Sequence, residues 1–247
     1  MTDTANIPES ISKIAEDEIF AFSCHAQVKC FTECCRMLEL ALTPYDVLRL
    51  RRATGLTSAQ LLEQYIITEQ EPGEAFPRLY LTMVDDGRAS CVFVGKDGCS
   101  VYSHRPGACR AYPLGRAATR TGTGVNDHFV IMKEDHCLGF LETAKQTPRS
   151  YICDQELNSY NLFNDAVIEI LQHPAIRDGY IPSHQNVELF LLALYNLDTF
   201  RTLLLTDQFQ DIMLSDEEKE HLEEDENLLK FGIDFLRKHI FPNFSQR

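Results

Sequence analysis

Cysteine is the residue type whose spacing in this chain indicates chemistry. Residues 22–35 read FSCHAQVKCFTECC and contain four cysteines, Cys24, Cys30, Cys34 and Cys35. Cys30 and Cys34 are one helical turn apart, so on a helix their sulfur atoms leave the same face and could bind one ion. Cys34 and Cys35 diverge by about 100° around a helix, so they would not easily fill two corners of one tetrahedron. The adjacent pair therefore favours two metal centres, or one centre and a core position.

A second group of cysteines lies far along the chain, in CVFVGKDGCSVYSHRPGACRAYP and EDHCLGF. Its members are Cys91, Cys99, Cys109 and Cys137. Four-cysteine sites usually join half-sites from distant segments, because each hairpin or helix start presents only one or two ligands. We therefore expect all eight cysteines to be metal ligands. Their number suits two zinc ions, or one four-iron cluster with four cysteines left over, and soft thiolates do not choose between the two metals.

These strings resemble those of a known family. The spacing CxxxxxCxxxCC, the following LTPYDVLRLRRATG and the later CVFVGKDGCSVYSHRPGACRAYP are similar to the bacterial cysteine-cluster family (CxxCxxCC, YkgJ-type), which is associated with zinc or iron chelation. The resemblance covers about residues 20–140 and implies a metal site, but no known reaction. Five residues separate the first two cysteines here, which leaves open whether Cys24 joins the same centre as Cys34.

Other residues near the cysteines are weaker candidates. His25 and His136 directly adjoin cysteines and would struggle to reach the same ion, so we expect neither of them, nor His104, to be a ligand. The ninth cysteine, Cys153, has no thiol near it in the sequence, which predicts a small buried residue.

Charge is distributed unevenly along the 247 residues. Lys and Arg number 23 against 37 Asp and Glu, a formal charge of −14. Residues 24–120 hold 12 basic and 10 acidic residues, whereas residues 121–247 hold 10 and 22. Arg36, Arg105 and Arg110 could offset a negative metal–thiolate centre, although solvated surface positions are about as plausible for them. The net acidity argues against nucleic-acid binding.

Cysteine usage also bears on the compartment. The N-terminus shows no signal peptide, and no segment approaches the roughly 20 apolar residues of a membrane helix. Nine cysteines in a reducing compartment indicate metal ligands or redox thiols, and an odd total would leave one unpaired if all formed disulfides. We therefore expect a cytoplasmic protein with metal ions as partners and no membrane association.

The fold expected is α+β. A cysteine-rich, metal-binding module at residues 20–145, built of short helices and antiparallel hairpins, precedes a helical C-terminal region at 149–240 that packs on it. Within the module we predict a short helix at about 31–40 and flexible residues at 116–124. Capping signals predict helices after Thr43, which ends at Gly55, and after Thr57.

Turn signals add three further expectations. Gly87 in DDGR predicts a hairpin turn, and Lys96 to Gly98 predicts a second tight turn, whose N–H groups could hydrogen-bond to metal-bound sulfur. A capping box at Ser215 predicts a helix that runs to about Lys238.

Three functions remain open. The leading one is a protein that chelates zinc or iron, with an iron–sulfur cluster as one form, in a site that is structural or exchanges metal. The second is an S-adenosylmethionine-dependent protein methyltransferase, because flagellin lysine methylases carry a similar cysteine block; no glycine loop or paired carboxylates support it. The third is a redox sensor in which Cys34 and Cys35 oxidise, which needs accessible thiols of low pKa.

Overall fold

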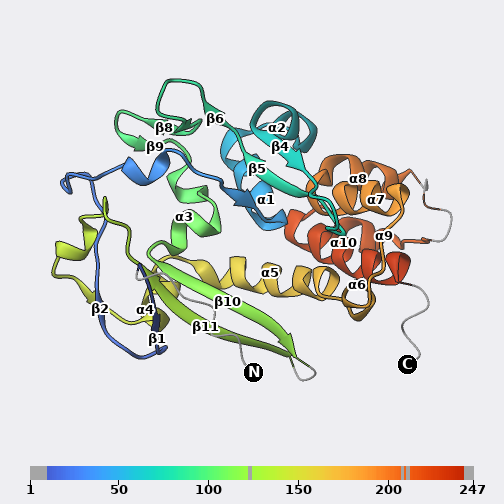
Figure 1. The fold of residues 1–247 in the computed structure, drawn as a ribbon. Helices are drawn as coiled ribbons and strands as arrows, with labels where there is room; N and C mark the ends of the chain where they lie inside the picture. Colours follow the sequence, from blue (N-terminus) through green and yellow to red (C-terminus); the bar gives the residue numbers. More distant parts are fainter. Residues whose placement is uncertain (1–9, 122–123, 207–208, 210–211, 242–247) are drawn as a thin grey trace. The chain divides into compact units, whose positions relative to one another are not determined.

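The protein has an α+β fold, as the sequence predicts (Figure 1). The structure, a computed structural model, describes residues 10–121, 124–206, 209 and 212–241. No helix in this part of the chain is long and apolar enough to cross a membrane.

The chain forms two compact units whose segments alternate along the sequence. The first consists of Met1–Leu38, Met83–Tyr102 and Gly107–Ser159, and the second of Glu39–Thr82, Ser103–Pro106 and Tyr160–Arg247. The expected division into residues 20–145 and 149–240 stays a prediction.

Short antiparallel strands dominate the first unit. One sheet has the order β1 (Ile11–Ile14), β11 (Gly124–Met132), β10 (Leu114–Thr121). Two-stranded sheets pair β2 (Phe20–Ala21) with β12 (Lys145–Gln146), β6 (Met83–Val84) with β7 (Ser90–Cys91), and β8 (Val94–Gly95) with β9 (Gly98–Cys99). The helical elements are η1 (Glu33–Cys35), α3 (Gly107–Ala111), η3 (Gly139–Leu141) and α4 (Pro148–Asp154).

Both predicted turns of this unit are present. Gly87 lies between β6 and β7 with φ +75°, and Gly98 closes the β8–β9 hairpin with φ +115°. A side chain is strained in such conformations, which is why glycine occupies them.

Two other expectations for this unit are wrong. Residues 116–121 are not a flexible segment, because β10 pairs residue by residue with β11 as far as Thr121; residues 122 and 123 lie outside the described residues. Within residues 31–40 only η1 is helical. The chain leaves η1 in an extended conformation because the Arg36 backbone forms an isolated antiparallel β-bridge with Ser90. Next to it, the Met37 N–H donates to the Ala89 carbonyl at 2.9 Å.

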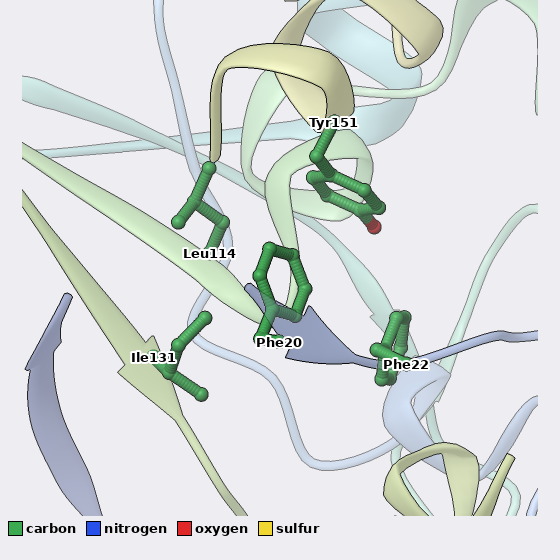
Figure 2. Close-up of a cluster of buried hydrophobic side chains, with 5 residues drawn as sticks. All are labelled: Phe20, Phe22, Leu114, Ile131 and Tyr151. Atoms are coloured by element: carbon green, nitrogen blue, oxygen red, sulfur yellow. The ribbon is translucent and has the colours of Figure 1, made fainter. Parts of the chain in front are cut away.

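An aromatic cluster forms the core of the first unit (Figure 2). Its five buried members are Phe20, Phe22, Leu114, Ile131 and Tyr151. The Tyr151 ring meets both phenylalanines edge-on, with centroids 5.7 and 6.4 Å apart. Such contacts add to the apolar burial that holds β2, β10, β11 and α4 together.

Helices make up most of the second unit. They are α1 (Pro44–Thr54), α2 (Ser58–Tyr65), α6 (Pro174–Arg177), α7 (His184–Tyr195), α8 (Leu197–Leu205), α9 (Asp216–His221) and α10 (Asp225–Ile240). α5 (Leu157–Leu171) begins in the first unit and continues in the second, as does the short η2 (Tyr102–His104). One sheet has the order β3 (Ala41–Leu42), β5 (Arg78–Leu81), β4 (Ile66–Glu69).

The predicted starts of α1 and α2 and the predicted end of α1 are confirmed. Thr43 and Thr57 each form a capping box, with Asp46 and Gln60 respectively, and Gly55 ends α1 in the left-handed conformation. The Ser215 capping box also forms, but the helix that it begins ends at His221. The predicted continuous helix is wrong. The Arg201 guanidinium donates to the carbonyl oxygens of Leu222 and Glu223, each at 3.2 Å, in the break between α9 and α10.

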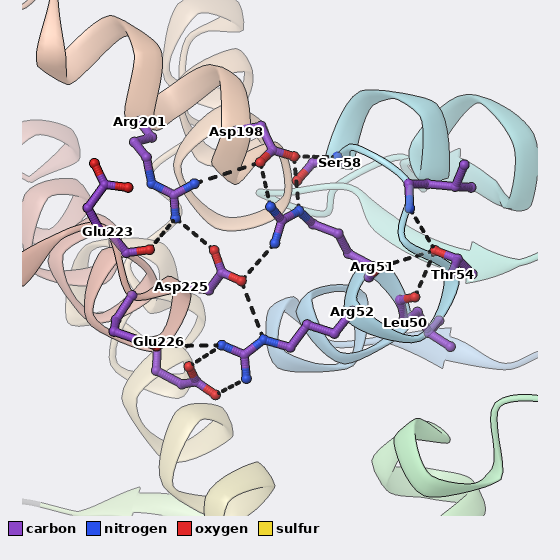
Figure 3. Close-up of polar contacts among 12 residues, drawn as sticks. Leu50, Arg51, Arg52, Thr54, Ser58, Asp198, Arg201, Glu223, Asp225 and Glu226 are labelled. Atoms are coloured by element: carbon purple, nitrogen blue, oxygen red, sulfur yellow. Dashed lines mark hydrogen bonds and ion pairs between the residues drawn. The ribbon is translucent and has the colours of Figure 1, made fainter.

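An ion network joins α1, α2, α8 and α10 (Figure 3). The Arg51 guanidinium donates to both carboxylate oxygens of Asp198, at 3.0 and 2.7 Å, and to Asp225 at 2.7 Å. Arg201 donates to the other oxygen of Asp225 at 2.7 Å, and the Ser58 N–H donates to Asp198 at 2.6 Å. Because these groups are largely shielded from water, removing one leaves a partner charge poorly compensated.

The Asp198→Asn variant tests this network. Burial raises the pKa of Asp198, but hydrogen bonds from Arg51 and Ser58 and the charge of Arg51 outweigh it, so the pKa lies below its usual range. The folded pKa is lower than the unfolded one, so the stabilisation exists above about pH 4 and is lost as the pH falls through the folded pKa. We expect the variant to lose about 2 kcal/mol of unfolding free energy at neutral pH, and less in acid.

Urea unfolding at neutral pH and at about pH 3 measures both effects. Asp234→Asn is the control, because the Asp234 carboxylate is exposed and its ion pair with Arg237 is long, at 3.5 Å. This replacement should lower the unfolding free energy by less than about 0.5 kcal/mol. A loss for Asp198→Asn that does not change with pH contradicts the prediction.

Candidate metal centre

All eight cysteines expected to bind metal lie in the first compact unit. Cys34 and Cys35 are in η1, Cys91 in β7, Cys99 in β9 and Cys109 in α3, whereas Cys24, Cys30 and Cys137 lie in turns and loops. Cys24 and Cys109 are exposed and the other six are half-buried.

Four thiols form what we call the first sulfur group, Cys34, Cys35, Cys91 and Cys99. The Cys35 thiol interacts with that of Cys34, and the charges of Cys34 and Cys99 both raise the pKa of Cys91. The expected divergence of Cys34 from Cys35 assumes an α-helix, which does not form here: the pair ends a 3-10 helix and Arg36 continues as extended chain, with φ −134° and ψ 147°. Whether the two sulfurs bind one ion or two stays a prediction.

Backbone pairing positions the first sulfur group. The bridge between Arg36 and Ser90 lays the segment after η1 beside β7, which carries Cys91 opposite Met83 of β6. The β8–β9 hairpin then returns Cys99 opposite Val94. A Cβ at Gly98 would lie 3.0 Å from the Phe31 ring, so the hairpin packs closely on the segment between Cys30 and Cys34.

The surroundings of Cys34 and Cys91 favour the neutral thiol over the thiolate. The hydrogen bond to Cys35 is the main factor that raises the pKa of Cys34, followed by burial and the charge of Cys35. Burial also raises the pKa of Cys91; N–H groups of Phe93 and Val94 oppose it, and the neighbouring cysteines add to it. A cation that replaced the protons would remove the repulsion between the thiolates.

Cys30 and Cys137 form what we call the second sulfur group. The Cys30 Sγ accepts a hydrogen bond from the Leu138 N–H at 3.1 Å, which brings it to the turn containing Cys137. Cys30 precedes η1 in a turn, so the expected shared helix face with Cys34 is not formed. Cys24 follows Ser23, whose N–H donates to the Gly139 carbonyl at 3.1 Å in this same region.

Gly139 allows the close packing of the second sulfur group. A Cβ at this position would lie 2.6 Å from the Phe22 ring and 2.7 Å from the Ser23 carbonyl oxygen. Neither neighbour can move freely, because Phe22 belongs to the aromatic cluster and the Ser23 N–H is bonded to Gly139. The absence of a side chain at Gly139 therefore lets the N-terminal segment approach the turn.

The three candidate arginines have partners within the protein. Arg36 donates to the Thr32 carbonyl at 2.6 Å, and buried Arg110 donates to the Gln155 carbonyl at 2.9 Å, between α4 and α5. Arg105 belongs to the second unit, where its carbonyl accepts from the Tyr160 hydroxyl at 3.0 Å.

The three histidines and Cys153 are placed as follows. His104 lies in the second unit and accepts a hydrogen bond from Arg49 at 3.2 Å. His25 lies 3.5 Å from Glu142, and His136 lies 3.6 Å from Glu134. Cys153 is exposed on α4, so its expected burial is wrong.

The two sulfur groups are open arrangements. In the described part of the chain, no three or more His, Cys, Asp or Glu side chains are grouped closely enough to hold a metal ion. The donor set nevertheless fits zinc or iron, because the thiols gather in one unit and backbone N–H groups donate to Cys30 and Cys91. The eight-cysteine ligand set stays a prediction, as does the placement of Cys24 and Cys109.

Sequence reasoning missed these backbone donors. The N–H groups that reach sulfur belong to Phe93, Val94 and Leu138, and their side chains are unrelated to metal binding. The sequence signal that could have found these donors is their position, because Phe93 and Val94 follow Cys91 by two and three residues and Leu138 directly follows Cys137. The expected donors were instead those of the glycine turn before Cys99.

Comparison with known families agrees with this site. Residues 23–138 match the CxxCxxCC family, described as a putative zinc- or iron-chelating domain, which confirms the resemblance and supports metal binding in general. Searches of curated proteins and of solved structures gave no match.

The Gly139→Ala variant tests the packing of the turn that bears Cys137. Because the new Cβ would overlap the Phe22 ring and the Ser23 carbonyl, we expect a loss of about 2 kcal/mol in unfolding free energy. Gly95→Ala is the matched control, since its Cβ would lie 3.7 Å from the Gly98 carbonyl oxygen, an ordinary contact. Thermal and urea unfolding measure both variants, and equal stability of the two would contradict the packing described above.

Proposed function

We propose that this protein binds zinc or iron through clustered cysteine thiolates. The observation that carries the proposal is the first sulfur group, in which cysteines of two distant segments, at positions 34–35 and 91–99, act on one another. The thiolates of these four cysteines would repel one another once they ionised, as the effects of Cys35 on Cys34 and of Cys34 and Cys99 on Cys91 indicate. A bound cation makes the same arrangement favourable.

The proposal assigns the eight thiols to two centres. The first centre takes the whole first sulfur group. The second takes Cys30 and Cys137, joined by Cys24 and Cys109. Cys24 is supported by the bond of its neighbour Ser23 to Gly139. Cys109 is supported by α3, which ends close to Tyr112, a residue that interacts with Cys137.

A metal at either centre would hold chain segments that are far apart in sequence. Thiolate-bound zinc would act as a structural clamp, and an iron–sulfur cluster would add the ability to accept an electron. The half-buried sulfurs would have to rotate toward the ion, so that metal binding and local ordering occur together.

Elemental analysis and an absorption spectrum of anaerobically purified protein distinguish zinc from iron. Iron with acid-labile sulfide and visible charge-transfer bands indicates a cluster, whereas a colourless protein that contains zinc indicates tetrathiolate sites. Methyl transfer, a cytoplasmic location and a bacterial origin stay predictions from the sequence.

Single cysteine variants test the assignment to two centres. Cys34→Ser should remove the ion of the first centre and Cys30→Ser that of the second, so each variant retains about half of the wild-type metal. The melting temperature should fall in both, because metal-binding free energy contributes to folding. Metal content per chain and thermal unfolding are the measurements.

Cys153→Ala is the control for these variants. Cys153 is exposed on α4 and belongs to neither sulfur group, so its replacement should leave the metal content unchanged. Full metal content in both serine variants would refute the proposed function, and complete loss in either one would refute two centres that can each hold an ion when the other is empty.

A further inference from the structure

The hydroxyl of Tyr112 is a buried polar atom whose hydrogen-bonding capacity is not used. Among the described residues it is one of few side-chain oxygens or nitrogens that are inaccessible to water and have no hydrogen-bond partner. A buried hydroxyl without a partner costs free energy, so its position calls for an explanation.

Packing on several sides holds Tyr112 in place. Its ring meets the Phe22 ring edge-on with centroids 6.0 Å apart. Its N–H donates to the Ala108 carbonyl at 3.2 Å, and its own carbonyl accepts from the Tyr151 hydroxyl at 2.6 Å. The phenol therefore cannot easily turn toward solvent to find a partner there.

The side chains of Cys137 and Glu134 interact electrostatically with the Tyr112 hydroxyl, although neither forms a hydrogen bond with it. The Glu134 carboxylate is about half exposed and lies 3.6 Å from His136, so water and an imidazole already surround it. Cys137 instead packs against the same aromatic cluster as Tyr112. A neutral thiol is a weak acceptor, whereas a thiolate accepts a strong, charge-assisted hydrogen bond.

We propose that Tyr112 is a positioning residue that donates a hydrogen bond to the Cys137 sulfur when this sulfur binds a metal ion. The inference rests on the proposed function and concerns its second centre. Leu138 N–H already donates to Cys30 at 3.1 Å, so both members of the second sulfur group would have a donor. The hydrogen bond would orient the sulfur and stabilise its negative charge.

The Tyr112→Phe variant of the full chain tests this inference, because it removes the hydroxyl and keeps the ring. The probes are zinc, measured by competition with a chromophoric chelator, and cobalt, measured by its sulfur-to-metal charge-transfer bands. We expect the second centre to bind zinc about tenfold more weakly, and its cobalt bands to shift to longer wavelength as the sulfur loses a hydrogen bond. Tyr102→Phe, the same change at an exposed position of the first unit, should alter neither.

A second readout separates this role from a structural one. The hydroxyl has no hydrogen-bond partner among the described residues, so the Tyr112→Phe protein stripped of metal should melt no lower than the wild type stripped of metal. Weaker zinc binding together with a lower melting temperature of the metal-free protein would indicate a packing defect and overturn the inference.

The Cys137→Ser variant separates this inference from the proposed function. If it loses the second ion while Tyr112→Phe binds zinc and cobalt as the wild type does, the inference is wrong and the proposed function stands. If Cys137→Ser keeps both ions, the assignment of Cys137 in the proposed function is wrong, and the role of Tyr112 falls with it.

Discussion

The arrangement of the first unit depends on the backbone hydrogen bonds that hold residues 20–23 against residues 139–146. β2 pairs with β12, the Phe22 N–H donates to the Ala144 carbonyl at 3.0 Å, and the Ser23 N–H donates to Gly139. The Gln146 side chain returns a hydrogen bond to the Phe22 carbonyl at 3.0 Å. These contacts close a loop of more than 100 residues, so their entropic cost has to be offset by the aromatic cluster beneath them.

Electrostatics then makes the gathered thiols responsive to a cation. The neighbouring Cys35 and burial raise the pKa of Cys34, and burial raises the pKa of Cys91, so these two sulfurs favour the protonated form unless a cation replaces the proton. Backbone N–H groups already donate to Cys30 and Cys91, which is the hydrogen bonding that a thiolate prefers. A raised thiol pKa also opposes the redox-sensor alternative, since the thiolate is the form that oxidises.

Local signals in the sequence predicted local structure well. The capping boxes at Thr43 and Thr57 and the turns at Gly87 and Gly98 depend on residues within four positions of one another, and all four form. The cysteine spacing predicted the match of residues 23–138 to the CxxCxxCC family model, because that spacing is distinctive.

Features that depend on distant residues could not be predicted. The predicted helix at 31–40 gives way to a bridge between Arg36 and Ser90, and no local propensity indicates that bridge. The hydrogen bond from the Leu138 N–H to the Cys30 sulfur depends on where the fold places that backbone group, which its side chain does not indicate. Similarly, the ion pair of Arg51 with Asp198 joins residues 147 positions apart, and charge type alone cannot select that partner.

The short stretch from Cys30 to Cys35 contributes to both sulfur groups. Cys30 faces the Leu138 turn, while Cys34 and Cys35 interact with each other and Cys34 acts on Cys91. With two proposed centres on one stretch, an ion that ordered it for the first centre would lower the entropy cost of filling the second. Linkage requires this assistance to be reciprocal, so the protein would load its ions cooperatively.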